Sequence, residues 1–258
     1  MKTVYTIFFS PTHTSQIIAD VIAESLEAEN EIQIDLTHGI PENKEKINGG
    51  WAVIAFPVYG GRIAETAVER FKQIRANGTK AIICVVYGNR DYDDALVELQ
   101  DLATAQGFIP VTAGAFIGEH SYSRPGRGIA ENRPDKNDID IAFSFGEKSA
   151  KKMTELQDIP PVLLIKGQRP YKEKGPKTPQ APITNEALCT QCGHCIDLCP
   201  TYAISLGDAL VTDANTCIKC CACVKECPNE ARIFETPYTD LLHSKCNERR
   251  EPELFYAQ

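Results

Sequence analysis

Two kinds of apolar segment alternate along the first 157 residues of the chain. Five short runs are rich in apolar, β-branched and aromatic residues and predict strands: Val4–Phe9, Glu31–Leu36, Trp51–Phe56, Lys80–Val86 and Val111–Ile117. Four longer segments carry apolar residues at helical spacing: Ser15–Leu26, Ala64–Ala76, Asp93–Ala105 and Ile139–Leu156. Runs without polar alternation are typical of parallel strands that are buried on both faces. The alternation predicts an α/β fold over residues 1–157, a doubly wound five-stranded parallel sheet with helices on both faces.

The character of the chain changes over residues 158–182. Ile159–Pro182 contains six of the sixteen prolines, which predicts a linker rather than a helix or strand. We expect the linker to pack against a domain, because the apolar run Val162–Ile165 would otherwise be exposed to water. Residues 183–236 contain most of the cysteines and are expected to form a second unit, and residues 237–258 are a mostly polar C-terminal tail.

The cysteines of the second unit follow one pattern twice. CTQCGHCIDLCP begins at Cys189 and CIKCCACVKECP begins at Cys217, so four cysteines and a proline recur 28 positions later. In this C-x2-C-x2-C-x3-C-P spacing, three thiolates hold one iron–sulfur cluster and the fourth ligates the other cluster. The repeat therefore predicts two [4Fe–4S] clusters with crossed ligand sets: Cys189, Cys192, Cys195 and Cys227 for one, and Cys217, Cys220, Cys223 and Cys199 for the other.

Zinc is the alternative metal, but zinc sites pair two C-x2-C halves across a longer loop and do not need a third cysteine and a proline. Disulfides of a secreted protein are a second alternative for the eleven cysteines. Against this, ten of them follow residue 188, and the N-terminal segment lacks the features of a signal peptide. We therefore expect metal-bound cysteines in a cytoplasmic protein without a membrane span.

The second unit resembles the bacterial two-cluster ferredoxins, which implies a small α+β domain over residues 183–236. The formal net charge of the chain is -8, and this unit has seven acidic residues against three basic ones. An acidic protein is a poor candidate for binding nucleic acid and suits a partner with a basic face. The sequence leaves open whether these acidic residues form a docking face or only confer solubility.

Ligands of doubly wound sheets bind beyond the carboxyl ends of the strands, so the loops after the strands carry the candidate chemistry. SPTHTS (Ser10–Ser15) has four hydroxyl groups before a helix, which suits a phosphate site, although the hydroxyls also suit a simple helix cap. PVYGGR (Pro57–Arg62) and YGNRDYDD (Tyr87–Asp94) combine glycines with tyrosines, which offer close backbone approach and flat faces. Together the loops predict a site for a planar ring with a phosphorylated tail.

These loops and residues 1–157 resemble flavodoxins, whose phosphate loop reads T/S-x-T-G-x-T. The resemblance implies FMN, with its phosphate at Ser10, Thr12, His13, Thr14 and Ser15. It places Pro57, Val58, Tyr59, Gly60 and Gly61 on one side of the flavin and Tyr87, Gly88, Asn89 and Tyr92 on the other. His13 stands where flavodoxins have Gly, so a positive φ at this position would be unfavourable.

The order of the two domains and the stretches FFSPTHTS, VYGNRDYDDAL and IGEHSYS resemble the flavodoxin–ferredoxin fusion proteins of anaerobic microbes. IGEHSYS begins the long loop Glu119–Asp138, which we expect to lie near the flavin or to contact the second unit; a solvated excursion is the alternative. The resemblance implies electron transfer between FMN and two [4Fe–4S] clusters, with low-potential electrons delivered to a partner redox protein, such as a reductase or a radical enzyme with its own iron–sulfur cluster.

Two other functions stay open at this point. One is a flavin-dependent reductase of a small substrate that receives electrons through its iron–sulfur clusters, and the other is a redox-sensing module. No catalytic residue is predicted, because the sequence contains no recognisable Ser/His/Asp set, paired carboxylates or nicotinamide-binding fingerprint.

Overall fold

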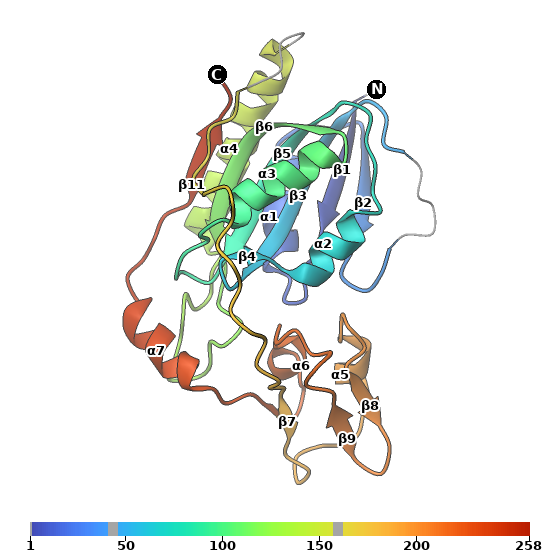
Figure 1. The fold of residues 1–258 in the computed structure, drawn as a ribbon, viewed down its shortest axis with the longest axis vertical. Helices are drawn as coiled ribbons and strands as arrows, with labels where there is room; N and C mark the ends of the chain where they lie inside the picture. The colour runs from blue at the N-terminus through green and yellow to red at the C-terminus, as the bar shows by residue number, and fades with distance from the viewer. Residues whose placement is uncertain (1, 41–45, 157–161) are drawn as a thin grey trace.

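The computed structural model describes residues 2–40, 46–156 and 162–258 (Figure 1). Its main sheet contains five parallel strands, which lie in the order β2 (Asn30–Asp35), β1 (Thr3–Phe8), β3 (Trp51–Tyr59), β5 (Thr79–Tyr87) and β6 (Phe108–Ile117). Counted along the chain, these strands follow the order 2-1-3-4-5 of the flavodoxin-like doubly wound sheet. The fold predicted for the first domain is therefore confirmed.

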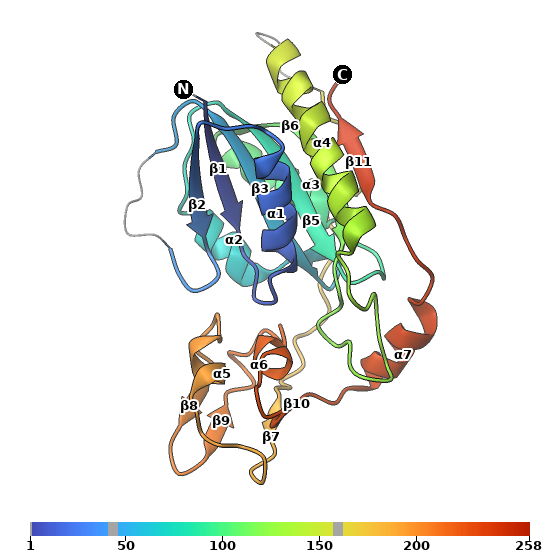
Figure 2. The same ribbon diagram turned by 180° about the vertical axis from the view of Figure 1, so that it is seen from behind.

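Helices cover both faces of this sheet (Figures 1 and 2). One face carries α1 (Thr14–Glu24) and α4 (Lys136–Glu155), which pack against each other, and the other face carries α2 (Glu65–Phe71) and α3 (Ala95–Ala105). The strand side chains between these layers are fully buried, for example Ile7, Val53 and Ile83. This double coverage explains the apolar runs of β1, β3, β5 and β6, whereas the edge strand β2 contains several polar residues and is largely exposed.

α2 ends earlier than the helical spacing predicted. Ile74 and Ala76 are buried as expected, but they lie in the turns that follow the helix. The backbone N–H of Ile74 donates to the carbonyl of Phe71, and that of Ala76 donates to Gln106 beside β6. Apolar spacing identified the buried residues here, whereas the tertiary hydrogen bond to Gln106 decided the backbone conformation.

The last residues of the chain return to the first domain. β11 (Glu253–Tyr256) pairs antiparallel with β6 at the edge of the main sheet, and α7 (Pro237–Lys245) precedes it. We call residues 237–258 the C-terminal return. Figure 2 shows it running from the second unit through α7 to the side of α4. Residues 237–258 are thus not a separate tail, because they supply an additional strand to the first domain. The run ELFY is too short to predict that strand from its own pattern.

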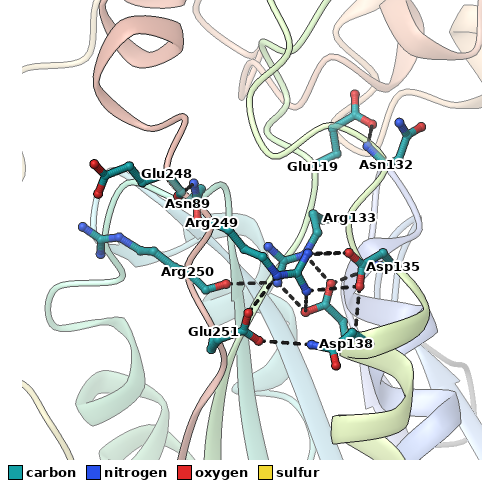
Figure 3. Close-up of polar contacts among 11 residues, drawn as sticks. Asn89, Glu119, Asn132, Arg133, Asp135, Asp138, Glu248, Arg249, Arg250 and Glu251 are labelled. Carbon is teal, nitrogen blue, oxygen red and sulfur yellow. Dashed lines mark hydrogen bonds and ion pairs between the residues drawn. The ribbon is translucent and has the colours of Figure 1, made fainter.

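A polar network anchors the C-terminal return to the loop before α4 (Figure 3). Arg133 forms a bidentate ion pair with the fully buried Asp138, and its Nη2 donates to the carbonyl of Arg250 at 3.2 Å. Arg249 donates to Asp135 at 2.6 Å. Asp135 also caps α4, because its side chain accepts from the backbone N–H of Asp138. The helix cap, the loop and the C-terminal return are therefore one connected structure.

The linker is packed along α3 and the loop before it. Asp101 accepts a hydrogen bond from Arg169 at 2.6 Å. Asp94, which is 3% exposed, accepts from the backbone N–H groups of Gln168 and Lys172, both at 2.8 Å. Buried carboxylates that accept backbone N–H groups fix a chain segment without any helix or strand. The described part of the linker is therefore held against the first domain.

The apolar run of the linker is only half buried. Leu163 is 7% exposed and Ile165 packs against the core, whereas Val162 and Leu164 are 58% and 70% exposed. The expectation that the whole run avoids water is wrong, because the extended backbone turns alternate side chains away from the domain. None of the described helices is both long and apolar enough to cross a membrane.

The second unit consists of short elements in two similar halves: β7 (Ile183–Thr184), α5 (His194–Asp197), β8 (Ile204–Leu206), β9 (Leu210–Thr212), α6 (Ala222–Lys225) and β10 (Arg232–Ile233). β7 pairs with β10 and β8 pairs with β9, both antiparallel, which confirms the small α+β domain. The unit lies beyond the carboxyl ends of the parallel strands (Figures 1 and 2). There Arg70 donates to the carbonyl of Pro200 at 2.5 Å, and the Tyr202 hydroxyl donates to the carbonyl of His38 at 2.6 Å.

The Arg133–Asp138 pair leads to a stability prediction. Arg133→Met leaves the Asp138 carboxylate buried without its partner, so we expect the free energy of unfolding to fall by about 3–5 kcal/mol. The matched control is Arg249→Met, whose side chain is 43% exposed, and a loss below about 1 kcal/mol is expected there. Urea unfolding followed by the emission of Trp51, the only tryptophan, measures both values. Equal losses in the two variants would contradict the anchoring role of Arg133.

Candidate functional site

The eight cysteines of the repeat line two separate pockets in the second unit. The outer set, as we call it, lines one pocket and consists of Cys189, Cys192, Cys195 and Cys227. The inner set lines the other pocket and consists of Cys199, Cys217, Cys220 and Cys223. Each set takes three cysteines from one copy of the repeat and one from the other, which is the crossed grouping that the spacing predicts. All four cysteines of the inner set are buried, whereas Cys192 of the outer set is exposed.

The repeat is present in the backbone as well as in the sequence. Three positions of each copy have positive φ, and the pairs are again 28 residues apart: Gln191 and Lys219, Gly193 and Cys221, and Tyr202 and Glu230. Gly193 and Cys221 are the residues immediately before α5 and α6. Cys221 therefore occupies the turn position of the second copy and not a position of the ligand pattern. Its side chain is 2% exposed and lies beside the inner set, as expected for a small buried residue.

Backbone N–H groups point at the sulfur of the last cysteine in each copy. Ala203 donates to Cys199 Sγ at 3.2 Å, and Ala231 donates to Cys227 Sγ at 3.3 Å. Hydrogen bonds to sulfur stabilise its negative charge and help to set the potential of a cluster. Burial has the opposite effect and raises the pKa of the Cys223 thiol to about 11, against the positive charge of Arg232. Thiolate ligands in these pockets therefore depend on bound metal for their stability.

The loop SPTHTS forms the turn between β1 and α1. His13 directly precedes α1 with a φ of 64°, a conformation that costs a residue with a Cβ about 1–2 kcal/mol. Its Nε2 lies 4.0 Å from Glu226 of the second unit, so the ring is directed at that unit. Ser10 Oγ accepts from the backbone N–H of Gln16 at 3.0 Å, and Thr12 and Thr14 are half-buried in the same turn.

Ser15 is the residue of this turn that best fits a bound phosphate. Its side chain is 1% exposed, and its Oγ has no hydrogen-bond partner among the described residues. Buried hydroxyls are almost always paired, so an unpaired one beside a helix N-terminus suits a phosphate oxygen. The turn therefore fits the phosphate of FMN despite the missing glycine.

The second loop is a β-hairpin that approaches the third loop closely. Pro57, Val58 and Tyr59 belong to the end of β3, and Gly60 and Gly61 turn the chain into β4 (Arg62–Ile63). Both glycines have positive φ, which matches the tight hairpin turns that glycine favours. A Cβ on Gly61 would lie 2.1 Å from the carboxylate of Asp93 in the third loop. The glycine thus allows the two loops to pack against each other.

Tyr59 connects this hairpin with the inner set of cysteines. The pKa of its hydroxyl is raised well above the usual value by burial and by the negative charge of Cys220 and Cys221. Tyr59 was expected to lie beside a flavin, and the structure places it near the inner set as well.

Three residues of the third loop pack within the first domain. Tyr92 is fully buried, its ring is 5.4 Å from that of Tyr87, and its hydroxyl donates to Glu253 of β11 at 2.7 Å. Asn89 is 3% exposed and donates to the carbonyl of Glu248 at 2.8 Å. These side chains were expected to line a flavin, but they are directed to the C-terminal return instead. Since the sequence did not predict that return, it could not predict their partners.

The long loop Glu119–Asp138 contacts the third loop and the second unit. A Cβ on Gly88 would lie 2.3 Å from the ring of His120, so Gly88 makes room for His120. The Tyr122 ring lies 4.9 Å from that of His120 and 5.3 Å from that of Phe234 in the second unit. Lys225 donates to Glu119 at 2.6 Å across the same boundary. The loop is thus packed between the two domains and is not a solvated excursion.

The comparisons with solved structures return flavodoxins at low similarity. Flavodoxin 1 from Bacillus cereus is 20% identical with a TM-score of 0.41, covering 58% of this chain and 98% of that chain. A Fusobacterium nucleatum flavodoxin bound to flavin mononucleotide is 15% identical with a TM-score of 0.40, covering 60% and 98%. Rubredoxin oxygen:oxidoreductase from Desulfovibrio gigas is 12% identical with a TM-score of 0.44, covering 60% and 37%. No curated protein matches the chain.

The second unit has a direct family match. Residues 181–228 match the family described as the 4Fe-4S dicluster domain. The chain joins a flavodoxin-like fold to a segment that matches the 4Fe-4S dicluster domain. In this fusion, the strand order establishes the flavodoxin-like fold of the first domain and the family match establishes the iron–sulfur character of the second. The match favours iron–sulfur ligation over zinc; among the described residues, no three His, Cys, Asp or Glu side chains are grouped to hold a single metal ion.

Sequence reasoning missed Arg232. It is 3% exposed, it lines the pocket of the outer set, and its Nη2 lies 3.8 Å from Cys223 of the inner set. The one available signal was its place in the repeat, because the residue 28 positions earlier is Ile204, which is also buried. A basic residue at a position that is apolar in the other copy is evidence of a specific role.

His120 leads to a prediction about pH. Burial lowers its pKa to about 4, and the positive charge of Lys225 adds to the effect. Below the unfolded value of about 6.5, unfolded chains bind a proton that the fusion does not bind, so stability is lost as the pH falls. Between pH 7 and pH 5 the loss from His120 is about 2 kcal/mol. His120→Gln should flatten the pH dependence of urea unfolding, and the exposed His38→Gln should leave it unchanged. Parallel curves for the wild type and His120→Gln would contradict the buried neutral imidazole.

Proposed function

We propose that this fusion is an electron-transfer protein that binds one FMN and two [4Fe–4S] clusters and passes low-potential electrons to a partner redox protein. The observation that supports this best is the position of Ile218. It lies between two cysteines of the inner set and lines their pocket, and it packs against the hydrophobic core of the first domain. The two candidate cofactor sites therefore share a boundary and are not merely present in one chain.

FMN is supported by the loops of the first domain. Ser10, Thr12, Thr14 and Ser15 would hold the phosphate at the N-terminus of α1, where the Ser15 hydroxyl lacks a partner among the described residues. The hairpin at Pro57–Gly61 and the Gly88 backbone would border the ring system. Tyr87, Asn89 and Tyr92 are almost fully buried, and Asn89 and Tyr92 fix the third loop through Glu248 and Glu253.

Both kinds of cofactor are redox groups with different electron counts. When bound, FMN exchanges one or two electrons and an iron–sulfur cluster exchanges one electron at a time. The chain supplies the geometry: Ile218 of the second unit packs against the core of the first domain, and Phe234 contacts Tyr122. Because both sites lie in one packed structure, electron exchange between them does not require a bimolecular encounter.

The exposure of the cysteines suggests an order for the centres. The inner set is buried, and Ile218, which lines its pocket, packs against the core of the first domain. The outer set includes the exposed Cys192, and its other three cysteines are partly exposed. We assign internal exchange with the flavin to the inner site and exchange with the partner to the outer site.

Cofactor content of anaerobically purified protein is the first test. We expect about eight iron, eight sulfide and one FMN per chain. In addition, Cys220→Ser in the inner set should abolish electron exchange with the flavin, measured by flash reduction of the flavin and cluster absorbance. Cys192→Ser in the outer set is the matched control and should preserve that exchange. Four iron per chain would contradict the second cluster, and flavin-free protein would contradict FMN.

The partner surface has its own test. The residues flanking the outer set are acidic and exposed, including Glu186, Asp197 and Glu230, which supports a partner with a basic face. The reduced protein should reduce cytochrome c, a basic one-electron acceptor, and the rate should fall steeply with ionic strength. Glu186→Gln combined with Glu230→Gln should lower the rate at low salt, while Glu24→Gln combined with Glu155→Gln, on the first domain, should not. A rate independent of salt would rule out electrostatic docking at this face.

A further inference from the structure

The most unusual buried charge in the molecule is Arg232 at the start of β10. Its side chain is held rigidly: Nη1 donates to Thr184 Oγ1 at 2.6 Å, and Nη2 donates to Thr212 Oγ1 at 2.6 Å and to the carbonyl of Pro182 at 3.2 Å. All three acceptors are uncharged, and they come from strands β7 and β9 and from the residue before β7. The guanidinium is therefore fixed in place without being neutralised.

Arg232 is in reach of both cysteine sets. Its Nη2 lies 3.8 Å from Cys223 Sγ of the inner set, and its side chain also lines the pocket of the outer set. The guanidinium thus acts on both pockets through space.

No carboxylate neutralises this charge. In the parts of the chain that the structure covers, no Asp or Glu oxygen lies within 4.0 Å of the guanidinium, and Nε is buried without a hydrogen-bond partner. A buried cation is strongly destabilising unless an opposite charge is nearby. Clusters ligated by four thiolates are negatively charged, and each becomes more negative on reduction. The opposite charge that Arg232 needs is therefore the charge that the two cysteine sets would hold.

The repeat shows that one arginine is present for two sites. The residue that corresponds to Arg232 in the first copy is Ile204, which is 4% exposed at the start of β8. A second arginine at that position would be the symmetric arrangement, and the sequence does not have it. The asymmetry, with contacts to both pockets, indicates that Arg232 is shared.

We propose that Arg232 is the common counter-ion of both [4Fe–4S] clusters and that it raises the reduction potential of each. The inference rests on the proposed function, because it requires both sets to hold clusters. Net charge and hydrogen bonds to sulfur are the main protein influences on cluster potential, and both act here in the same direction. A positive charge stabilises the reduced, more negative cluster, and the planar guanidinium can present separate N–H groups to separate acceptors.

The experiment compares three single variants in the full-length holoprotein. Arg232→Gln removes the charge, Arg232→Lys keeps the charge without the planar group of donors, and Lys136→Gln removes a charge from the first domain, where the side chain is 90% exposed. Anaerobic redox titration followed by electron paramagnetic resonance measures both cluster potentials, after iron and sulfide have been counted. We expect Arg232→Gln to move both potentials to more negative values, Arg232→Lys to move them much less, and Lys136→Gln to have little effect because water screens its charge.

Other outcomes would contradict the proposal. A shift of only one cluster potential would show that Arg232 is not shared. Equal shifts in Arg232→Gln and Lys136→Gln would show that Arg232 acts only through the net charge of the protein. If Arg232→Gln loses its clusters, the measurement rests on Arg232→Lys: retained clusters with near-native potentials support the counter-ion, and loss from both variants assigns Arg232 to folding alone. A wild type with fewer than two clusters would instead overturn the proposed function.

Discussion

Both covalent connections of the iron–sulfur unit are packed against the flavodoxin-like domain. On the way in, Asp94 and Asp101 bind the linker along α3. On the way out, β11 joins the main sheet and the buried Arg133–Asp138 pair anchors the segment before it. Domains joined by one free linker move relative to each other by default, and their mean separation is set by linker length. Here only short stretches of chain lie between these attachments and the second unit. The relative position of the candidate cofactor sites therefore depends on these attachments more than on the domain boundary itself.

The boundary between the domains includes many polar contacts. It uses single hydrogen bonds to carbonyls, such as that of Arg70, and ion pairs such as Glu119–Lys225 and Arg124–Glu235. Exposed or half-exposed ion pairs contribute little stability on their own. The aromatic contact between Tyr122 and Phe234 and the packing of Ile218 add apolar area close to the inner set. Individually weak contacts can therefore hold the two domains in one orientation. The two attachments limit how far the second unit can move, and the contacts at the boundary select one of the remaining orientations. Electron transfer between the candidate sites benefits from this limited movement and does not need a large interface.

Much of the molecule could be predicted from its sequence, and the exceptions share a physical cause. The continuous apolar runs predicted the parallel sheet because burial on both faces leaves no alternation, and the cysteine spacing predicted the two four-cysteine pockets because the ligand geometry is local. β11 was missed because a four-residue edge strand derives its conformation from β6 and not from its own pattern. The misassignment of Asn89 and Tyr92 followed, since their partners belong to that unpredicted return. Arg232 was only counted among the three basic residues of its unit, because composition does not reveal burial.

The edge position of β11 also has a consequence for the biogenesis of the protein. Chains are synthesised from the N-terminus, so the parallel strands of the first domain emerge well before the strand that completes their sheet. Until β11 is made, β6 has an open edge whose N–H and C=O groups are free to pair with other chains. The whole iron–sulfur unit lies between these two strands in the sequence. The second unit must therefore leave the ribosome before the first domain is complete, and its cysteines are accessible to metal delivery while the flavodoxin-like sheet is still unfinished.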